Sequence, residues 1–207
     1  MGDMEQAVFI KIIEELIDRD RTLTKIVENW GYPPQWQRKP GFATLIHIIL
    51  EQQVSGSSAK ATFERLNNVV KVLTPASFLA LDDLELKQIG FSRQKTIYGR
   101  QLAQTIIDGV LNLEELANLE DSTIRKKLIA IKGIGDWTVD MYLMMALQRL
   151  DIFPSKDLAV AIAVWEIKNL PTRPTISELE LIAQPWKPYR SIATQLLWHY
   201  YLHRLRS

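Results

Sequence analysis

The stretch LIAIKGIGDWT at residues 128–138 and the stretch FPSKD at residues 153–157 decide how this sequence is interpreted. In the first, an apolar helical pattern reaches the turn Gly133-Ile134-Gly135 and then restarts. Glycine can adopt positive φ and lets another backbone come close. Amides at such a turn and at the N-terminus of the next helix point outward together, where they can bind an anion such as a DNA phosphate. The first stretch therefore predicts a helix-hairpin-helix, and Asp157 in the second begins another apolar helix.

Helical periodicity extends over the rest of the chain. Apolar residues recur at intervals of three and four along residues 8–17 and 63–73. The recurring residues are Val8, Phe9, Ile12, Ile13, Leu16 and Ile17 in the first segment and Phe63, Leu66, Val69, Val70 and Leu73 in the second. The serines among residues 55–58 supply capping hydroxyls. Asp157 precedes Leu158–Ile167, which is apolar nearly all round and expected to be buried. Sustained strand-like alternation is absent from the sequence, which predicts an all-α fold.

Composition is that of an ordinary globular protein. The 207 residues are 47% hydrophobic and 24% charged, enough to bury a sizeable core. The sequence has no cysteine, which excludes disulfides, a cysteine nucleophile and a cysteine-ligated iron–sulfur cluster. No apolar run reaches the ~20 residues that cross a bilayer, and no signal-peptide pattern begins the chain. We therefore expect a cytoplasmic location and no membrane association.

A net charge of +1 argues against wholesale electrostatic wrapping of nucleic acid, although a local basic face remains compatible with DNA binding. The candidates for that face are Arg93, Lys95, Arg100, Arg125, Lys126, Lys127, Lys132, Lys156 and Arg190. The alternative is that most of them are solvated helix surface. Lys132 and Lys156 are the strongest candidates because they flank the two motifs.

These motifs resemble those of the helix-hairpin-helix DNA glycosylases of base excision repair, in which the hairpin is followed by a Gly/Pro-containing loop and an Asp. Residues 49–55, ILEQQVS, and 186–193, WKPYRSIA, resemble the branch of DNA-3-methyladenine glycosylase II. The resemblance implies one domain over 1–207 with the hairpin at 128–140. It also implies two helical lobes, 48–150 and 1–47 plus 151–207, with a cleft between them.

The resemblance further implies a monomer that binds double-stranded DNA containing damaged bases, associated with the nucleoid if the chain is bacterial. Asp157 occupies the position of the catalytic Asp in this family. Cleavage of an N-glycosidic bond develops positive charge on the deoxyribose, which a carboxylate stabilises while it orients or deprotonates the attacking water. The plain alternative for Asp157 is an ordinary helix N-cap, and one residue can do both.

The position at which strand-nicking members of the family carry a lysine bears on the type of reaction. In the family, glycosylases that also nick the strand carry a Schiff-base Lys two positions after the second hairpin glycine. That position is Trp137 here. An indole cannot form the imine, so the resemblance points to the monofunctional, water-using branch without lyase activity.

Extrusion of the target base requires an aromatic pocket and a residue that fills the gap in the duplex. By resemblance, Trp137 and Trp198 line the pocket, and their electron-rich rings favour positively charged alkylpurines such as 3-methyladenine and 7-methylguanine. Met141 stands where a relative has Tyr, which puts the shape of the pocket in doubt. Gln53 matches the residue that fills the gap. The residues expected to contact DNA are Gln53, Lys132, Gly133, Ile134, Gly135, Thr138, Lys156 and Arg190.

No cofactor is required by this chemistry, although hairpins of some relatives hold a monovalent or divalent cation through backbone carbonyls. Here those carbonyls are Ile129, Ile131 and Gly133. Two alternatives stay open from the sequence: a non-catalytic helix-hairpin-helix DNA-binding protein, which would need neither Asp157 nor the tryptophans, and a glycosylase for deaminated bases. The preferred lesion is not fixed by the sequence.

Overall fold

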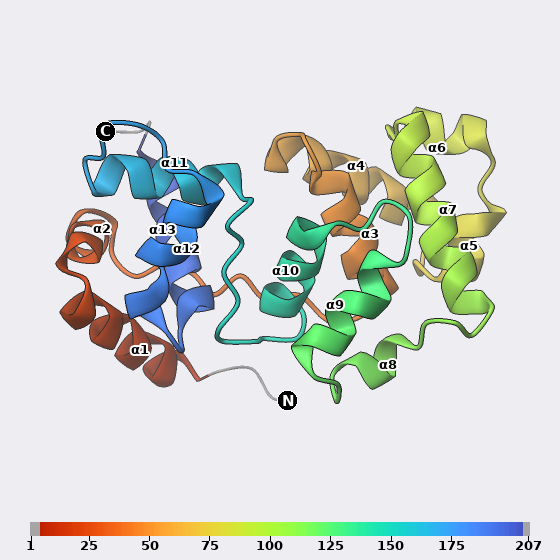
Figure 1. Ribbon diagram of the computed structural model, residues 1–207. Helices are drawn as coiled ribbons and strands as arrows, with labels where there is room; N and C mark the ends of the chain where they lie inside the picture. Colours follow the sequence, from red (N-terminus) through yellow and green to blue (C-terminus); the bar gives the residue numbers. More distant parts are fainter. Residues whose placement is uncertain (1–4, 205–207) are drawn as a thin grey trace. The chain divides into compact units, whose positions relative to one another are not determined.

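The computed structural model describes residues 5–204. Within that range the regular elements are thirteen α-helices and two 3-10 helices, and no strand occurs. The prediction of an all-α fold is confirmed. The helices divide into two compact units, an internal unit of Arg38–Leu147 and a terminal unit that combines Met1–Gln37 with Gln148–Ser207 (Figure 1). The single domain and the lobe limits implied by the resemblance stay predictions.

The internal unit is built around α3, which packs against α4, α7 and α10, while α5 packs along α7 and α9 packs against α10. Its helices are α3 (Phe42–Glu51), α4 (Gly56–Val69), α5 (Pro75–Ala80), α6 (Asp83–Ile89), α7 (Arg93–Ile107), α8 (Leu113–Leu116), α9 (Asp121–Ile129) and α10 (Asp136–Met145). Seven of the ten residues of α3 are buried, which explains its central place. Capping side chains begin α4 through α8, and those of α5 and α6 form complete capping boxes.

The helix expected over residues 63–73 ends earlier than its apolar pattern. Val70 is the C-cap of α4 with φ −107° and ψ 109°, so Val70 and Leu73 lie beyond the helix. Thr74 then caps α5, whose first residue is Pro75. The α-helical conformation is disfavoured for a residue that precedes a proline, and the capping box stabilises the start of a new helix. The local start signal of α5 therefore overrides the apolar spacing.

The terminal unit joins the two ends of the chain around α13, which packs against α11, α2 and α1 (Figure 1). Its helices are α1 (Gln6–Arg19), η1 (Arg21–Leu23), α2 (Thr24–Trp30), α11 (Leu158–Ile167), α12 (Ile176–Ile182), η2 (Gln184–Trp186) and α13 (Arg190–His203). The first expected helix and Leu158–Ile167 are confirmed. The prediction that α11 is buried is confirmed at Val160, Ala161, Ala163, Val164 and Ile167 and is wrong at Leu158 and Trp165, which are exposed.

A partly buried polar junction ties the N-terminal helices to the C-terminal ones. Asp20 Oδ2 accepts hydrogen bonds from Lys168 Nζ at 2.7 Å and Trp186 Nε1 at 2.9 Å, and its Oδ1 accepts from Thr22. Burial by itself raises the pKa of Asp20, but these donors outweigh it and hold the pKa below its ordinary value. Phe153 packs edge-on against the fully buried Trp186, with ring centroids 5.8 Å apart. The loop that leads to Asp157 is thereby anchored in this core.

No helix between residues 5 and 204 combines the length and the apolar character that spanning a membrane would require.

Candidate active site and nucleic-acid interface

Asp157 is the N-cap of α11. Its backbone N–H bonds to Pro154 O at 2.9 Å, and its Oδ1 accepts the N–H of Val160 at 2.9 Å. The side chain is 8% exposed. A carboxylate at a helix N-terminus also benefits from the positive end of the helix dipole. The sequence-based alternative of an N-cap is thus realised, and it leaves the carboxylate held in one orientation.

Trp198 of α13 reaches the same carboxylate oxygen. Its Nε1 donates to Asp157 Oδ1 at 3.4 Å, and its ring meets that of Trp36 edge to face with centroids 6.0 Å apart. Trp36 lies in the non-helical segment before α3 and is held by a hydrogen bond from its backbone N–H to Gln195 Oε1 at 3.3 Å. The terminal unit therefore gathers one carboxylate and two partly buried indoles. Aromatic faces beside a carboxylate are suited to hold a planar, positively charged ring.

The predicted helix-hairpin-helix is present as α9, a turn at residues 130–135, and α10. The turn is closed by backbone hydrogen bonds from Ile131 to Leu128 O and from Ile134 to Ile131 O, both 3.1 Å. Arg125 of α9 bonds to Asp136 at 3.3 Å and to Asp140, clamping the two helices together. Because the N-cap is Gly135, α10 begins without a side-chain cap. The N–H groups of its first turn thus receive no cap from the side chain of residue 135, and helix N-termini of this kind are suited to bind anions.

The two hairpin glycines differ in backbone conformation and in the space around them. Gly133 has φ +94°, and a Cβ there would lie 2.1 Å from Cγ of Tyr98, so it serves the packing of this chain. Gly135 has φ −104°, and no heavy atom lies within 4 Å of the place that a Cβ would occupy. The freedom of glycine to adopt positive φ is thus used at Gly133 and not at Gly135, whose extended backbone begins α10. The open space over Gly135 is where a foreign backbone could approach.

Residues 46–188 match the family model of the HhH-GPD superfamily base excision DNA repair protein. The chain belongs to this superfamily. A Bacillus subtilis relative is 32% identical over 185 residues, an alignment that covers 86% of this chain and 64% of the relative. DNA-3-methyladenine glycosylase 1 of Schizosaccharomyces pombe is 29% identical over 182 residues, covering 86% of this chain and 80% of that protein.

A solved structure agrees with this HhH-GPD assignment. It is that of the Schizosaccharomyces pombe 3-methyladenine DNA glycosylase in complex with abasic DNA. It superposes with a TM-score of 0.81 at 28% identity and covers 90% of this chain and 93% of that one.

The other predicted pocket residues of this HhH-GPD chain lie in the internal unit. Trp137 is half-buried in the first turn of α10, and Met141, one turn later, is buried at 3% exposure. Thr138 is 1% exposed and its Oγ1 accepts a hydrogen bond from Gln52, so its side chain serves the hairpin. Only the backbone N–H of Thr138 is then suited to a phosphate. The roles of these residues toward DNA stay predictions.

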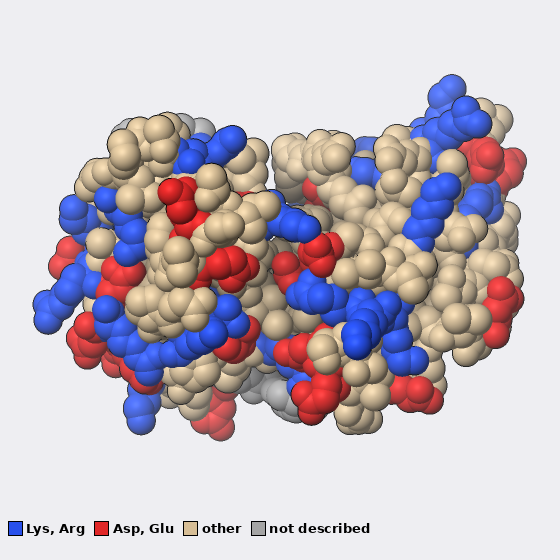
Figure 2. Space-filling view, in the orientation of Figure 1, with Lys and Arg blue, Asp and Glu red and all other residues tan. Residues whose placement is uncertain are grey.

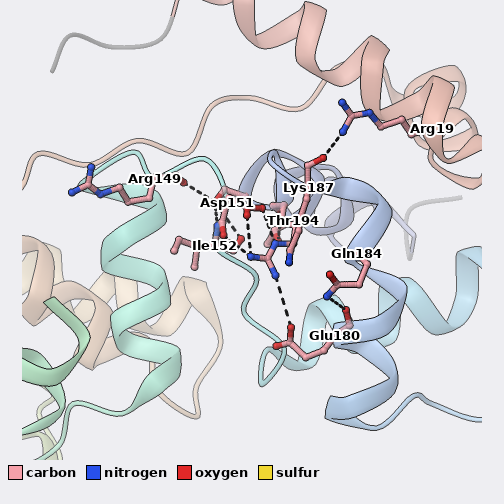
Figure 3. A network of polar contacts seen from close by, with 10 residues as sticks. Arg19, Arg149, Asp151, Ile152, Glu180, Gln184, Lys187 and Thr194 are labelled. Carbon is pink, nitrogen blue, oxygen red and sulfur yellow. Dashed lines mark hydrogen bonds and ion pairs between the residues drawn. The ribbon is translucent and has the colours of Figure 1, made fainter. Parts of the chain in front are cut away.

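Several expected basic contacts are engaged within the fold. Arg190 donates to both carboxylate oxygens of Asp151, at 2.7 and 3.1 Å, and to the Asp151 carbonyl at 2.9 Å (Figure 3). Arg100 pairs with Asp83 at 2.9 Å, and Lys95 Nζ donates to Leu50 O at 2.6 Å. Arg190 therefore ties α13 to the segment before Asp157, and any contact with DNA would have to compete with that pairing.

The lysines that flank the two motifs are exposed. Lys126 and Lys127 in the last turn of α9 and Lys132 in the turn are exposed, as is Lys156 beside Asp157. Lys and Arg gather over α9 in Figure 2, interspersed with acidic side chains. This mixture agrees with the small net charge and with local contacts rather than wrapping.

Gln53 follows α3 in an exposed, left-handed conformation with φ 57°. It lines an open groove of about 560 Å³ together with parts of α7 and the hairpin. The lining residues are Gln52, Gln53, Val54, Gly90, Ser92, Gln94, Lys95, Tyr98, Gly133, Ile134 and Gly135. The structure thus brings the predicted gap-filling residue and the predicted phosphate-binding turn onto one surface of the internal unit.

The carbonyls predicted to hold a cation are partly occupied. Ile131 O accepts the N–H of Ile134, and Gly133 O accepts Gln52 Nε2 at 2.8 Å. A carbonyl oxygen has a second lone pair, so a cation at Ile129, Ile131 and Gly133 stays a prediction.

Sequence reasoning missed three residues that the structure makes prominent. Trp36 contacts Trp198, Gln52 bonds to the hairpin, and Tyr98 covers Gly133. Two signals were available: a tryptophan in a proline-flanked loop, and a second glutamine at the end of an apolar helix. Tyr98 offered none, because its partner is distant in sequence.

Proposed function

We propose that this chain is a monofunctional DNA glycosylase of base excision repair that hydrolyses the N-glycosidic bond of flipped, alkylated purines. One observation carries the proposal: the Asp157 carboxylate is fixed at the N-terminus of α11 by Val160 N–H and by the indole of Trp198. The S. pombe relatives named for 3-methyladenine support the substrate class.

In this proposal Asp157 stabilises the positive charge that develops on the deoxyribose as the base departs. It also orients or deprotonates the water that attacks the sugar. The carboxylate does not have to change rotamer as the bond breaks, because the hydrogen bonds from Val160 and Trp198 already fix its orientation. An N3- or N7-alkylated purine carries positive charge and leaves readily, so a strong general acid is unnecessary.

The aromatic groups would hold the extruded base. Trp198 and Trp36 supply indole faces that favour a cationic ring, and Trp137 is a pocket residue by resemblance to the family. Met141 stands in place of a pocket Tyr, and its flexible side chain would orient the base less strictly in that part of the site. Neutral, deaminated purines would then be poorer substrates, by up to about 30-fold if a cation–π term of roughly 2 kcal/mol is lost.

The internal unit would bind the duplex. The N–H groups at the start of α10, with Lys132 close by in the sequence, would hold a phosphate without regard to base sequence. Gln53 would fill the gap left by the extruded nucleotide, since its amide can hydrogen-bond the orphaned base. Because Trp137 replaces the Schiff-base Lys, the product would be an intact strand with an abasic site.

The decisive experiment is incubation of the protein with methylated duplex DNA, followed by chromatography of released bases and electrophoresis of the strand. Release of 3-methyladenine and 7-methylguanine from an unbroken strand is the expected result. Release of hypoxanthine alone from deaminated DNA would indicate the alternative specificity. Tight duplex binding with no base released from either substrate would indicate a non-catalytic DNA-binding protein.

A further inference from the structure

One side chain joins the end of α3 to the hairpin. Gln52 is the C-cap of α3, and its Nε2 donates to Gly133 O at 2.8 Å and to Thr138 Oγ1 at 2.9 Å. The two acceptors lie on opposite sides of the Gly135 position, one in the turn and one in the first turn of α10. A single amide therefore uses both of its N–H groups to hold the hairpin at two points.

The residue that follows turns sharply away. Gln53 is exposed with φ 57°, an uncommon backbone for a residue with a side chain, which persists where the surroundings fix it. Val54, next along, is 45% exposed. Gln53, with its fixed conformation, is thus the next residue in the chain after Gln52, which is hydrogen-bonded to the hairpin.

A second tie comes from α7. Lys95 Nζ donates to Leu50 O at 2.6 Å, one of the last carbonyls of α3. A cation at a helix C-terminus is favourable because the helix dipole is negative there. Burial lowers the pKa of Lys95, in keeping with an ammonium turned into the fold. Two side chains thus hold the end of α3: Gln52, which is the C-cap of α3 itself, and Lys95 of α7.

We infer that Gln52 and Lys95 are positioning residues that couple the phosphate-binding turn to Gln53. Held in this way, Gln53 stands at a fixed offset from the hairpin, and both line the same groove. When a duplex binds at Gly135, its stacked bases then lie next to Gln53, and Gln53 does not have to be ordered on binding. The inference rests on the proposed function, and it assigns roles to two residues that the chemistry at Asp157 does not use.

The coupling has a distinctive consequence. Loosening the end of α3 through Lys95 leaves the bonds of the hairpin in place, so affinity for undamaged duplex is kept. Removing Gln52 also takes two hydrogen bonds from the hairpin, which lowers affinity for every duplex by a common factor. Affinity for DNA with an extruded nucleotide falls, because Gln53 must be ordered on binding. Loss of two hydrogen bonds predicts a fall of about tenfold in the preference for abasic over undamaged duplex.

The test uses Gln52→Met, which keeps the length of the side chain and removes both donors. The matched control is Gln101→Met, an exposed glutamine of α7. Dissociation constants are measured for undamaged duplex and for duplex with a tetrahydrofuran abasic site, and 2-aminopurine beside the site reports unstacking. Thermal unfolding checks that each variant is folded. The expected result is a preference for abasic over undamaged duplex that is reduced about tenfold, in addition to any loss of affinity common to both duplexes.

Lys95→Met provides the second variant, with Lys87→Met of α6 as its control for charge. Lys95→Met loosens α3 without touching the hairpin, so it must reduce the same preference even if Gln52→Met fails to fold. Equal losses for both duplexes in the Gln52 or Lys95 variant, or an unchanged preference, would overturn the coupling. Wild-type protein that neither prefers abasic duplex nor releases a base would instead refute the proposed function.

Discussion

The indole Nε1 of Trp198 lies 3.4 Å from Oδ1 of Asp157, the same oxygen that accepts the N–H of Val160. One carboxylate oxygen is therefore held both by its own helix, α11, and by the helix packed against it, α13. Trp198 thus has two separable features, a ring face and an N–H donor. Substitutions that remove one or both can distinguish their contributions.

Trp198→Phe removes the donor and keeps a ring. We expect single-turnover release of 7-methylguanine and of hypoxanthine to slow by a similar factor of about ten, since a hydrogen bond to a charged group is worth about 1.5–3 kcal/mol and this one is long. Trp198→Ala removes the ring as well, so release of the charged 7-methylguanine should fall further than that of neutral hypoxanthine, by up to about 30-fold.

The matched control for Trp198→Phe is Trp165→Phe, which removes an indole donor to Leu170 O on the exposed side of α11. Its release rates should equal those of wild type. Unfolding of each variant must be measured too, because truncation of a packed tryptophan costs about 3–5 kcal/mol. If Trp198→Ala lowers both rates by the same factor, the ring does not select for charge.

Asp157→Asn should abolish base release while affinity for abasic DNA stays equal or rises. Asparagine is as good an N-cap as aspartate, so the Val160 hydrogen bond and the stability of α11 should be retained. What is lost is the negative charge that the transition state requires. Asp82→Asn, at the N-cap of α6, is the control and should leave release unchanged. Wild-type release by Asp157→Asn would reduce Asp157 to a cap.

Gly135→Leu should lower affinity for undamaged and abasic duplexes by the same factor, about tenfold if one charge-assisted contact is blocked. The fold should tolerate the change, since φ is −104° and the space is open. Gly133→Ala should instead destabilise the protein, because its Cβ would overlap Tyr98. Fluorescence anisotropy gives the affinities and thermal unfolding the stabilities. A Gly135 defect confined to abasic DNA would contradict a phosphate-binding role.

The sequence predicted the helical class because the apolar spacing of α1 and α11 and the cap at Asp157 are local signals. It predicted the hairpin for the same reason. Local rules failed where two signals competed, as when the Thr74-Pro75 start ended the helix that Val70 and Leu73 would have extended.

The tertiary contacts around the site could not be predicted from spacing. Tyr98 lies over Gly133, Trp36 meets Trp198 and Lys95 bonds to Leu50 O, and each pair is separated by many residues. Arg190 illustrates the same limit, since its charge suggested a DNA contact and its position bonds it to Asp151. Charge alone does not distinguish a surface contact from an internal ion pair.

Borohydride should trap no covalent complex between this protein and DNA that it is processing, and the strand should remain intact. The reason is that Trp137, at the start of α10, has no amine to form an imine with the sugar. Denaturing electrophoresis of labelled DNA with and without borohydride measures both outcomes, with a strand-nicking glycosylase run in parallel as the positive control. A trapped adduct in amounts that match turnover would refute the monofunctional assignment.

Asp20→Asn should destabilise the terminal unit at neutral pH by about 1.5–2 kcal/mol, because partly buried Lys168 loses its charge-assisted hydrogen bond to a carboxylate. The deficit should shrink as the pH falls. In wild type the folded pKa of Asp20 lies below the unfolded one, so its stabilisation is complete above about pH 5. It is lost as the pH falls through the lowered folded value, where the carboxylate takes up a proton in both states.

Urea unfolding of wild type and Asp20→Asn at pH 7 and at pH 3 measures this difference in the free energy of unfolding. Asp18→Asn, which changes an exposed carboxylate two residues away on α1, is the control and should match wild type within about 0.5 kcal/mol at either pH. A deficit of equal size at both pH values would mean that Asp20 acts through the shape of its hydrogen bonds and not through its charge. Release of bases should decline with the loss of stability, since the junction at Asp20 holds Trp186 and, through it, Phe153 in the loop that precedes Asp157.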